Sequence, residues 1–176
     1  ERFRLTLKAS QRITHFKRLV GAEEEIAEFA RRAGALGERL GVVLFQIPPN
    51  LRYSHEVLEG FLAAVPPAIR AALEVRHESW YEPEAKALLE ARGVALCAAD
   101  TAERPLASIP LTAPHVYLRL RKEDYAPEEI EAWGRQVREV LDAGRDVYCY
   151  FKHEGGGVGP AYARALSEAA AAGAPA

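Results

Sequence analysis

The stretch GVVLFQIPPNLRYSHEVLEGFLAAVPPAIRAALEVRHESW, residues 41–80, contains one complete strand–helix–strand unit. The apolar run at its start is typical of a buried strand, which Pro48 and Pro49 end because proline cannot donate to a sheet. Residues 54–66 follow as the predicted helix, with Ser54 suited to cap it. A second β-rich run closes the stretch. Two strands that are joined by a helix run parallel, so this unit predicts a parallel sheet.

The same alternation extends in both directions from this unit. Further strands are predicted over 2–10, 94–100, 115–121 and 146–154, and further helices over 21–41, 82–93, 127–144 and 160–172. The turn-rich segment 101–114 predicts a short helix or none. Repeated strand–helix units indicate an α/β fold with a parallel sheet, either an open doubly wound sheet or a closed (β/α) barrel.

The number of units favours an incomplete barrel. About six βα units are present, whereas the common TIM barrel has eight and about 250 residues. The chain contains no methionine and opens on ERFRLTLKAS, which already resembles a strand. We therefore expect a TIM-like (β/α) barrel that forms a single domain over residues 1–176, with one or two N-terminal units missing.

Composition restricts the class of protein. The chain has 176 residues, 49% of them hydrophobic, and a formal net charge of −2, which excludes a protein that binds nucleic acid mainly through its total charge. Cys97 and Cys149 stand alone, without metal-ligand spacing, and indicate a reducing compartment. No apolar segment approaches the ~20 residues that span a bilayer, and no signal peptide is recognisable. We expect a cytoplasmic protein that does not bind membranes.

Side chains alternate between the two faces of a strand, which divides each strand into two sets. In LEVRH, Leu73, Val75 and His77 form one set, and Glu74 and Arg76 form the other. The other strands divide in the same way, with one apolar set and one set that becomes polar near the strand end. In a barrel the apolar set lies under the helices and the polar set faces the C-terminal mouth. The residues expected to converge there are Lys8, Gln46, Glu74, Arg76, Asp100, Arg119, Arg121 and Lys152.

Four or five cations facing about two carboxylates indicate a small anionic ligand, since guanidinium groups bind phosphate and carboxylate in bidentate fashion. The favoured hypothesis is a metal-independent enzyme, a hydrolase or a lyase, that acts on a phosphorylated, carboxylated or nucleotide substrate. Glu74 or Asp100 would be the general base, and Lys8 is an alternative nucleophile. The structural alternative is a salt-bridge network that fills the top of the barrel.

Five motifs in order, KASQRITH, VLFQIPP, EVRHESW, VYLRLR and YFKHE, resemble the YecE-like family, the domain of unknown function numbered seventy-two. The resemblance implies a TIM-barrel-like fold and a larger domain with additional N-terminal strands. It does not imply a reaction. Many members have RLHG where this chain has RLRK, so Arg121 replaces a histidine. The site positions that the resemblance implies are Lys8, Thr14, His15, Gln46, Glu74, Arg76, His77, Trp80, Tyr117, Arg119, Lys152, His153 and Glu154.

Two alternatives stay open. A metal-dependent phosphoesterase-like hydrolase could use ligands from His15, Glu74, His77, Asp100, His153 and Glu154, but no HxH or HExxH spacing is present, so no cofactor is predicted. His77 falls in the apolar set and fits a loop anchor better than a ligand. A non-enzymatic module that binds an anion or RNA is the other alternative, with bases stacked on Trp80, Tyr81, Tyr117, Tyr148 or Tyr150.

Overall fold

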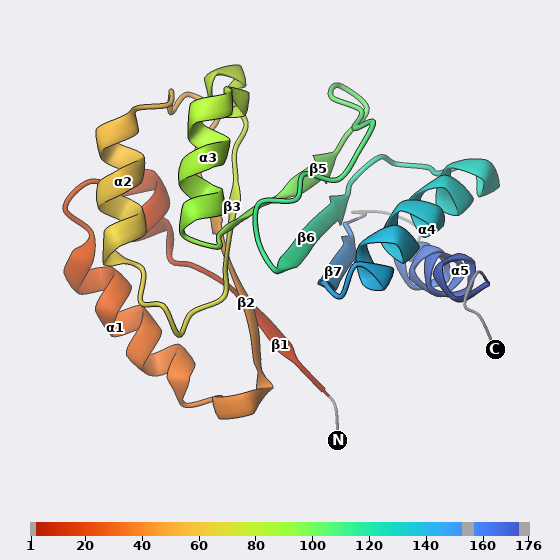
Figure 1. The fold of residues 1–176 in the computed structure, drawn as a ribbon, viewed down its shortest axis with the longest axis horizontal. Helices are drawn as coiled ribbons and strands as arrows, with labels where there is room; N and C mark the ends of the chain where they lie inside the picture. Colours follow the sequence, from red (N-terminus) through yellow and green to blue (C-terminus); the bar gives the residue numbers. More distant parts are fainter. Residues whose placement is uncertain (1–2, 153–156, 173–176) are drawn as a thin grey trace. The chain divides into compact units, whose positions relative to one another are not determined.

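The computed structural model describes residues 3–152 and 157–172, which form a mixed α/β fold with alternating strands and helices (Figure 1). The chain divides into two compact units, Glu1–Leu96 and Cys97–Ala176. Each unit is a parallel sheet with helices packed on one face. Among the described helices, none combines the length and the apolar character needed to cross a membrane.

The first unit contains a four-stranded parallel sheet in the order β1-β2-β3-β4. Short helical turns follow β1, precede β2 and follow β3. The elements in chain order are β1 (Leu5–Lys8), the π-helix η1 (Arg12–Phe16), α1 (Glu23–Gly34), the 3₁₀-helix η2 (Gly37–Arg39), β2 (Leu40–Gln46), α2 (His55–Ala64), β3 (Ala71–Glu74), the 3₁₀-helix η3 (Glu78–Tyr81), α3 (Pro83–Ala91) and β4 (Ala95–Leu96).

The core of the first unit lies between this sheet and its helices. Phe45 of β2 and Leu73 of β3 are buried together with Leu58 and Phe61 of α2 and Leu89 of α3. The ring of Phe45 meets the ring of Phe61 edge to face, with centroids 5.0 Å apart. The apolar sets of β2 and β3 therefore face the helices, as alternation predicts.

The second unit contains a three-stranded parallel sheet in the order β5-β6-β7. Its elements are β5 (Ala98–Asp100), β6 (His115–Leu120), α4 (Pro127–Asp142), β7 (Asp146–Phe151) and α5 (Gly159–Ala171). Residues 101–114 form no regular helix or strand, in agreement with their turn-rich sequence. Leu118 and Leu120 of β6 pack against Trp133 and Val137 of α4 and Leu166 of α5.

The second unit is tightly packed between α4 and α5, and Cys149 of β7 packs against its core. Gly134 of α4 lies against α5 so tightly that a Cβ added to it would be 2.5 Å from the Cβ of Ala169. Cys149 of β7 packs against the core of this unit, and burial raises the pKa of its thiol to about 12.

The predicted strands and helices are present, with two differences. The predicted strand 94–100 divides at Cys97, because Leu96 pairs with Leu73 of β3 whereas Ala98 pairs with Leu118 of β6. The predicted strand 71–80 ends at Glu74, and the chain then forms a loop and η3. The closed barrel, the single domain and the missing N-terminal units stay predictions.

Candidate functional site

A buried carboxylate lies at the ends of β2 and β3 in the first unit. Glu74 is 0% exposed and is the Cα partner of Gln46 across the two strands. Its Oε1 accepts a hydrogen bond from Nε2 of Gln46 at 3.1 Å and lies 3.7 Å from Nη2 of Arg76, whose side chain is 39% exposed. A buried charge is costly unless it is compensated, and here an amide and a guanidinium share one oxygen.

Lys8, Thr14 and His15 come from the end of β1 and the turn after it. Lys8 is exposed and is the Cα partner of Leu44, which puts it in the same set as Gln46. Thr14 is buried, and its Oγ1 lies 3.4 Å from the carbonyl oxygen of Ser10 and 2.8 Å from Nδ1 of His15. The Thr14–His15 contact lies within η1, a π-helical turn, which is a rare local structure that is frequent at functional sites.

His77 and Trp80 hold the loops that follow β2 and β3. Nδ1 of His77 accepts a hydrogen bond from the N–H of Ser79 at 3.2 Å and caps η3. Nε1 of Trp80 donates to the carbonyl of Leu51 at 2.8 Å, and Oγ of Ser79 accepts from the N–H of Tyr53 at 2.9 Å. These side chains bond to backbone groups of the two loops that follow β2 and β3 and hold the loops in place next to the strand ends.

The loop after β1 contains a feature for which the sequence has no signal. Arg18 and Leu19 have φ angles of 52° and 70°, a left-handed conformation that non-glycine residues rarely adopt. Such a residue costs about 1–3 kcal/mol. Burial of Leu19 and two hydrogen bonds from Arg18 to Asn50, of 3.0 and 3.1 Å, hold this conformation.

Three cations and three tyrosines, Tyr117, Tyr148 and Tyr150, share one face of the second unit, the face opposite α4 and α5. Arg119 of β6 is the Cα partner of Tyr150 of β7. The N–H of Lys152 donates to the carbonyl of Leu120, which continues the ladder and brings Lys152 beside Arg121. Strand alternation places Arg119 and Tyr150 on this face, and Arg121 and Lys152 are the next residues of the same two sets, one position past the end of each strand.

Tyr117 of β6 lies on the same face and is buried beneath Tyr150. Its ring is stacked on the ring of Tyr150, with centroids 5.2 Å apart and an angle of 28° between the planes. Tyr117 is 5% exposed and Tyr150 is 37% exposed. We call Tyr117, Arg119, Arg121, Tyr150 and Lys152 the cationic face.

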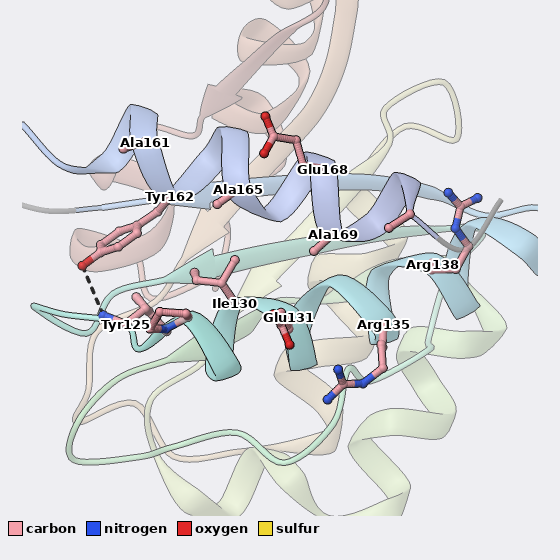
Figure 2. A pocket seen from close by; sticks show the side chains of 12 residues that line it. Tyr125, Ile130, Glu131, Arg135, Arg138, Ala161, Tyr162, Ala165, Glu168 and Ala169 are labelled. Carbon is pink, nitrogen blue, oxygen red and sulfur yellow. Dashed lines mark hydrogen bonds between the residues drawn. The ribbon is translucent and has the colours of Figure 1, made fainter.

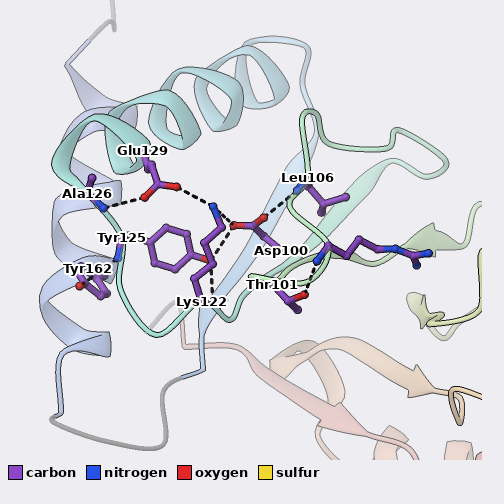
Figure 3. Close-up of polar contacts among 9 residues, drawn as sticks. Asp100, Thr101, Leu106, Lys122, Tyr125, Ala126, Glu129 and Tyr162 are labelled. Atoms are coloured by element: carbon purple, nitrogen blue, oxygen red, sulfur yellow. Dashed lines mark hydrogen bonds and ion pairs between the residues drawn. The ribbon is translucent and has the colours of Figure 1, made fainter.

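The set to which Asp100 belongs lies on the opposite side of the sheet from the cationic face. Figure 3 shows the polar contacts of Asp100. Asp100 is 1% exposed and is the Cα partner of Leu120, which packs under the helices. Its Oδ2 accepts from the hydroxyl of Tyr125 at 3.0 Å, and its Oδ1 accepts from the N–H of Leu106 at 2.9 Å. The expectation that Asp100 shares a face with Arg119 and Arg121 is therefore wrong, because the strand turns this side chain toward α4.

Lys122 and Glu129 connect Asp100 to the start of α4. Nζ of Lys122 lies 3.6 Å from Oδ2 of Asp100 and 2.7 Å from Oε1 of Glu129, while Oε2 of Glu129 accepts from the N–H of Ala126 at 2.9 Å. The hydrogen bond between Lys122 and Glu129 lowers the pKa of the carboxyl and raises that of the ammonium group. Burial raises the pKa of Tyr125, which keeps its hydroxyl a donor. Sequence analysis missed Lys122 and Tyr125 because their partner is 22 to 25 residues away along the chain.

A groove of about 810 Å³ lies between α4 and α5 (Figure 2). Ile130 and the alanines of α5 line it, and the hydroxyl of Tyr162 accepts a hydrogen bond from the N–H of Tyr125 at 3.3 Å at one end. Arg135 and Arg138 lie at the other end. None of the residues that sequence analysis selected lines this groove, so it is separate from the cationic face.

A metal-dependent hydrolase would need several ligands placed around one ion. Among the described residues, no group of three or more His, Cys, Asp or Glu side chains is placed to hold an ion. His15 and Glu74 are described and belong to no such group. His153 and Glu154 lie outside the described residues.

Comparisons with known proteins identify relatives. A family model described as "Protein of unknown function DUF72" matches residues 1–175. A crystal structure of a DUF72 family protein from Thermotoga maritima is 22% identical with a TM-score of 0.67, and the match covers 94% of this chain and 72% of that chain. One from Enterococcus faecalis is 19% identical with a TM-score of 0.74, covering 94% of this chain and 77% of that chain. No curated protein matches. At these identities the structural likeness shows the fold.

Proposed function

The chain belongs to the DUF72 family, and we propose that it binds a small phosphorylated or carboxylated molecule on the cationic face. The observation that supports this proposal is the gathering of Arg119, Arg121 and Lys152 at the adjacent ends of β6 and β7, while Asp100 of the neighbouring strand is turned to the helices.

The chemistry of these side chains favours a compact anion. Each guanidinium can donate two parallel hydrogen bonds to a phosphate or a carboxylate, and the lysine adds a mobile point charge. At the ends of parallel strands an anion can approach the cationic groups from solvent, which is where (β/α) folds bind substrates.

We further propose that the protein is an enzyme in which Glu74 of the first unit takes or gives a proton. Its carboxylate lies at the ends of β2 and β3, the position where (β/α) folds place catalytic groups, and Gln46 and Arg76 hold one of its oxygens. Asp100 is a weaker candidate, because its side chain is turned toward α4, away from the cationic face. Lys8 remains the alternative nucleophile, and borohydride trapping with carbonyl substrates would test it.

Anion binding can be measured by calorimetry with pyrophosphate and citrate as probes. Arg119→Met should weaken binding about tenfold or more, the loss expected for one charge-assisted contact of about 1.4 kcal/mol. Arg164→Met, an exposed change on α5, is the matched control and should leave binding unchanged. If neither probe binds, or if Arg119→Met binds both as the parent does, the proposed site is wrong.

Catalysis is tested separately, with a panel of phosphate monoesters and 2-phospho-carboxylates. We expect Glu74→Gln to abolish turnover of any substrate found and to leave anion binding intact, since glutamine preserves the shape of the side chain. Turnover by Glu74→Gln at the parent rate would exclude Glu74. Binding without turnover across the panel would favour a non-enzymatic binding module.

A further inference from the structure

We infer that the anion bound on the cationic face is a mononucleotide, whose base stacks on Tyr150 and whose phosphate lies between Arg121 and Lys152. This inference rests on the proposed anion binding and adds the class of ligand.

Tyr150 has the properties of a stacking platform. Its ring is partly open to solvent, while the face turned to the protein is covered by the ring of Tyr117, which is itself almost fully buried. A tyrosine that is held by a second ring loses little further freedom when a ligand stacks on it, so its contact with a flat ring is pre-organised. Neither a sugar phosphate nor a small carboxylate has such a ring.

The spacing of the cations relative to this platform fits a nucleotide. Lys152 follows Tyr150 by two residues, just past the end of β7 where its N–H continues the ladder, which separates their Cα atoms by about 7 Å. Arg121 lies beside Lys152 on the neighbouring strand, so these two cations form a row beyond the ring. A ribose bridges a base and its 5′-phosphate over a comparable length. Arg119, the Cα partner of Tyr150, lies in the same row as the ring and faces the ribose or the edge of the base.

The small extent of this face favours a mononucleotide over a nucleic acid polymer. The charged groups occupy two rows at the ends of two strands, and the chain has a net charge of −2. A polymer needs a cationic track that follows its backbone over several phosphates. Stacking is tolerant of base identity, so we expect purines to bind better than pyrimidines because they cover more of the ring.

The experiment compares three probes by calorimetry on the full chain: AMP, ribose 5-phosphate and adenosine. AMP should bind about tenfold more tightly than ribose 5-phosphate, and adenosine should bind weakly. Tyr150→Leu should reduce the affinity for AMP to that for ribose 5-phosphate, whereas Tyr150→Trp should retain the difference between the two probes. Lys152→Met should weaken both phosphorylated probes to a similar extent.

A measurement on the parent protein makes the test independent of variant folding. In saturation-transfer NMR, the adenine protons of AMP should receive more saturation than the ribose protons.

Equal affinities for AMP and ribose 5-phosphate, with no preferential saturation of adenine, would overturn the nucleotide inference and leave the proposed anion binding intact. Absence of binding by both phosphorylated probes would also overturn the inference, and the proposed function falls with it only if pyrophosphate and citrate do not bind either. Much tighter, steeply salt-dependent binding of an oligoadenylate would also overturn the inference and would favour RNA.

Discussion

Replacing Asp100 by alanine tests whether this carboxylate is a structural tie between β5 and the loops around it. The change removes the acceptor of two buried hydrogen bonds, from Tyr125 and from the N–H of Leu106, and the anion near Lys122. Each donor left without a partner costs about 1–3 kcal/mol. We therefore expect Asp100→Ala to lower the free energy of unfolding by about 3–5 kcal/mol, in the range for breaking a buried ion pair.

Two further variants show how much of the Asp100→Ala loss of stability comes from the Tyr125 contact. Tyr125→Phe removes the hydrogen bond to Asp100 and the acceptor of the Lys122 N–H, and should cost about 1–3 kcal/mol. The double variant should cost less than the sum of the single variants, because both act on one contact. Asp124→Ala is an exposed control in the same loop and should stay within about 0.5 kcal/mol of the parent.

Urea unfolding followed by circular dichroism at pH 7 gives these free energies, and amide hydrogen exchange locates them. Protection should fall in Asp100→Ala at Leu106, whose N–H loses its acceptor. An unfolding free energy within 1 kcal/mol of the parent, with unchanged exchange at Leu106, would refute the structural tie and would return Asp100 to the candidates for catalysis.

Three further predictions concern the helix layers. Gly134→Ala should destabilise the protein by about 1–3 kcal/mol, because the new methyl group would lie 2.5 Å from the Cβ of Ala169. Gly60→Ala in α2, where nothing lies within 4 Å, should instead stabilise it by about 0.5–1 kcal/mol in urea unfolding. Lys122→Met should reduce the loss of unfolding free energy that the parent protein shows as the pH falls into the acid range. Since Lys122 holds the pKa of Glu129 below its usual 4.5, the pair stabilises the fold above that pH and less as pH falls through the lowered pKa.

For each of these three predictions, one experimental result would contradict the structural reason given for it. Gly134→Ala with the parent's unfolding midpoint would mean that α4 and α5 separate at no cost. A destabilised Gly60→Ala would show that α2 is packed on that side. Parallel stability–pH curves for Lys122→Met and the parent would remove Glu129 as the source of the acid dependence.

Alternation along single strands was a reliable guide wherever a strand has two chemically different sets. Leu73 and Glu74 differ so strongly in polarity that their faces follow from the sequence, and the structure buries Leu73 with the helices. The same holds for Leu118 and Arg119, which are neighbours on β6.

The face to which a side chain points could not be predicted where neighbouring residues of a strand do not differ in polarity. The run 94–100 is apolar up to its last residue, so neither the break at Cys97 nor the side to which Asp100 points could be deduced. The ties from Asp100 to Tyr125 and Lys122 depend on how loops distant in sequence meet in space, and a pattern of adjacent residues carries no information on that.

The half-buried thiol of Cys149 packs against the core of the second unit, and its reactivity can report when that packing opens. Burial raises the pKa of this thiol, so alkylating reagents, which attack the thiolate, react slowly while β7 stays packed. Release of β7 from the helices returns the thiol toward ordinary reactivity. The rate of alkylation at Cys149 therefore measures how often the strand that bears Tyr150 and leads to Lys152 detaches, and a ligand that binds these residues should slow it.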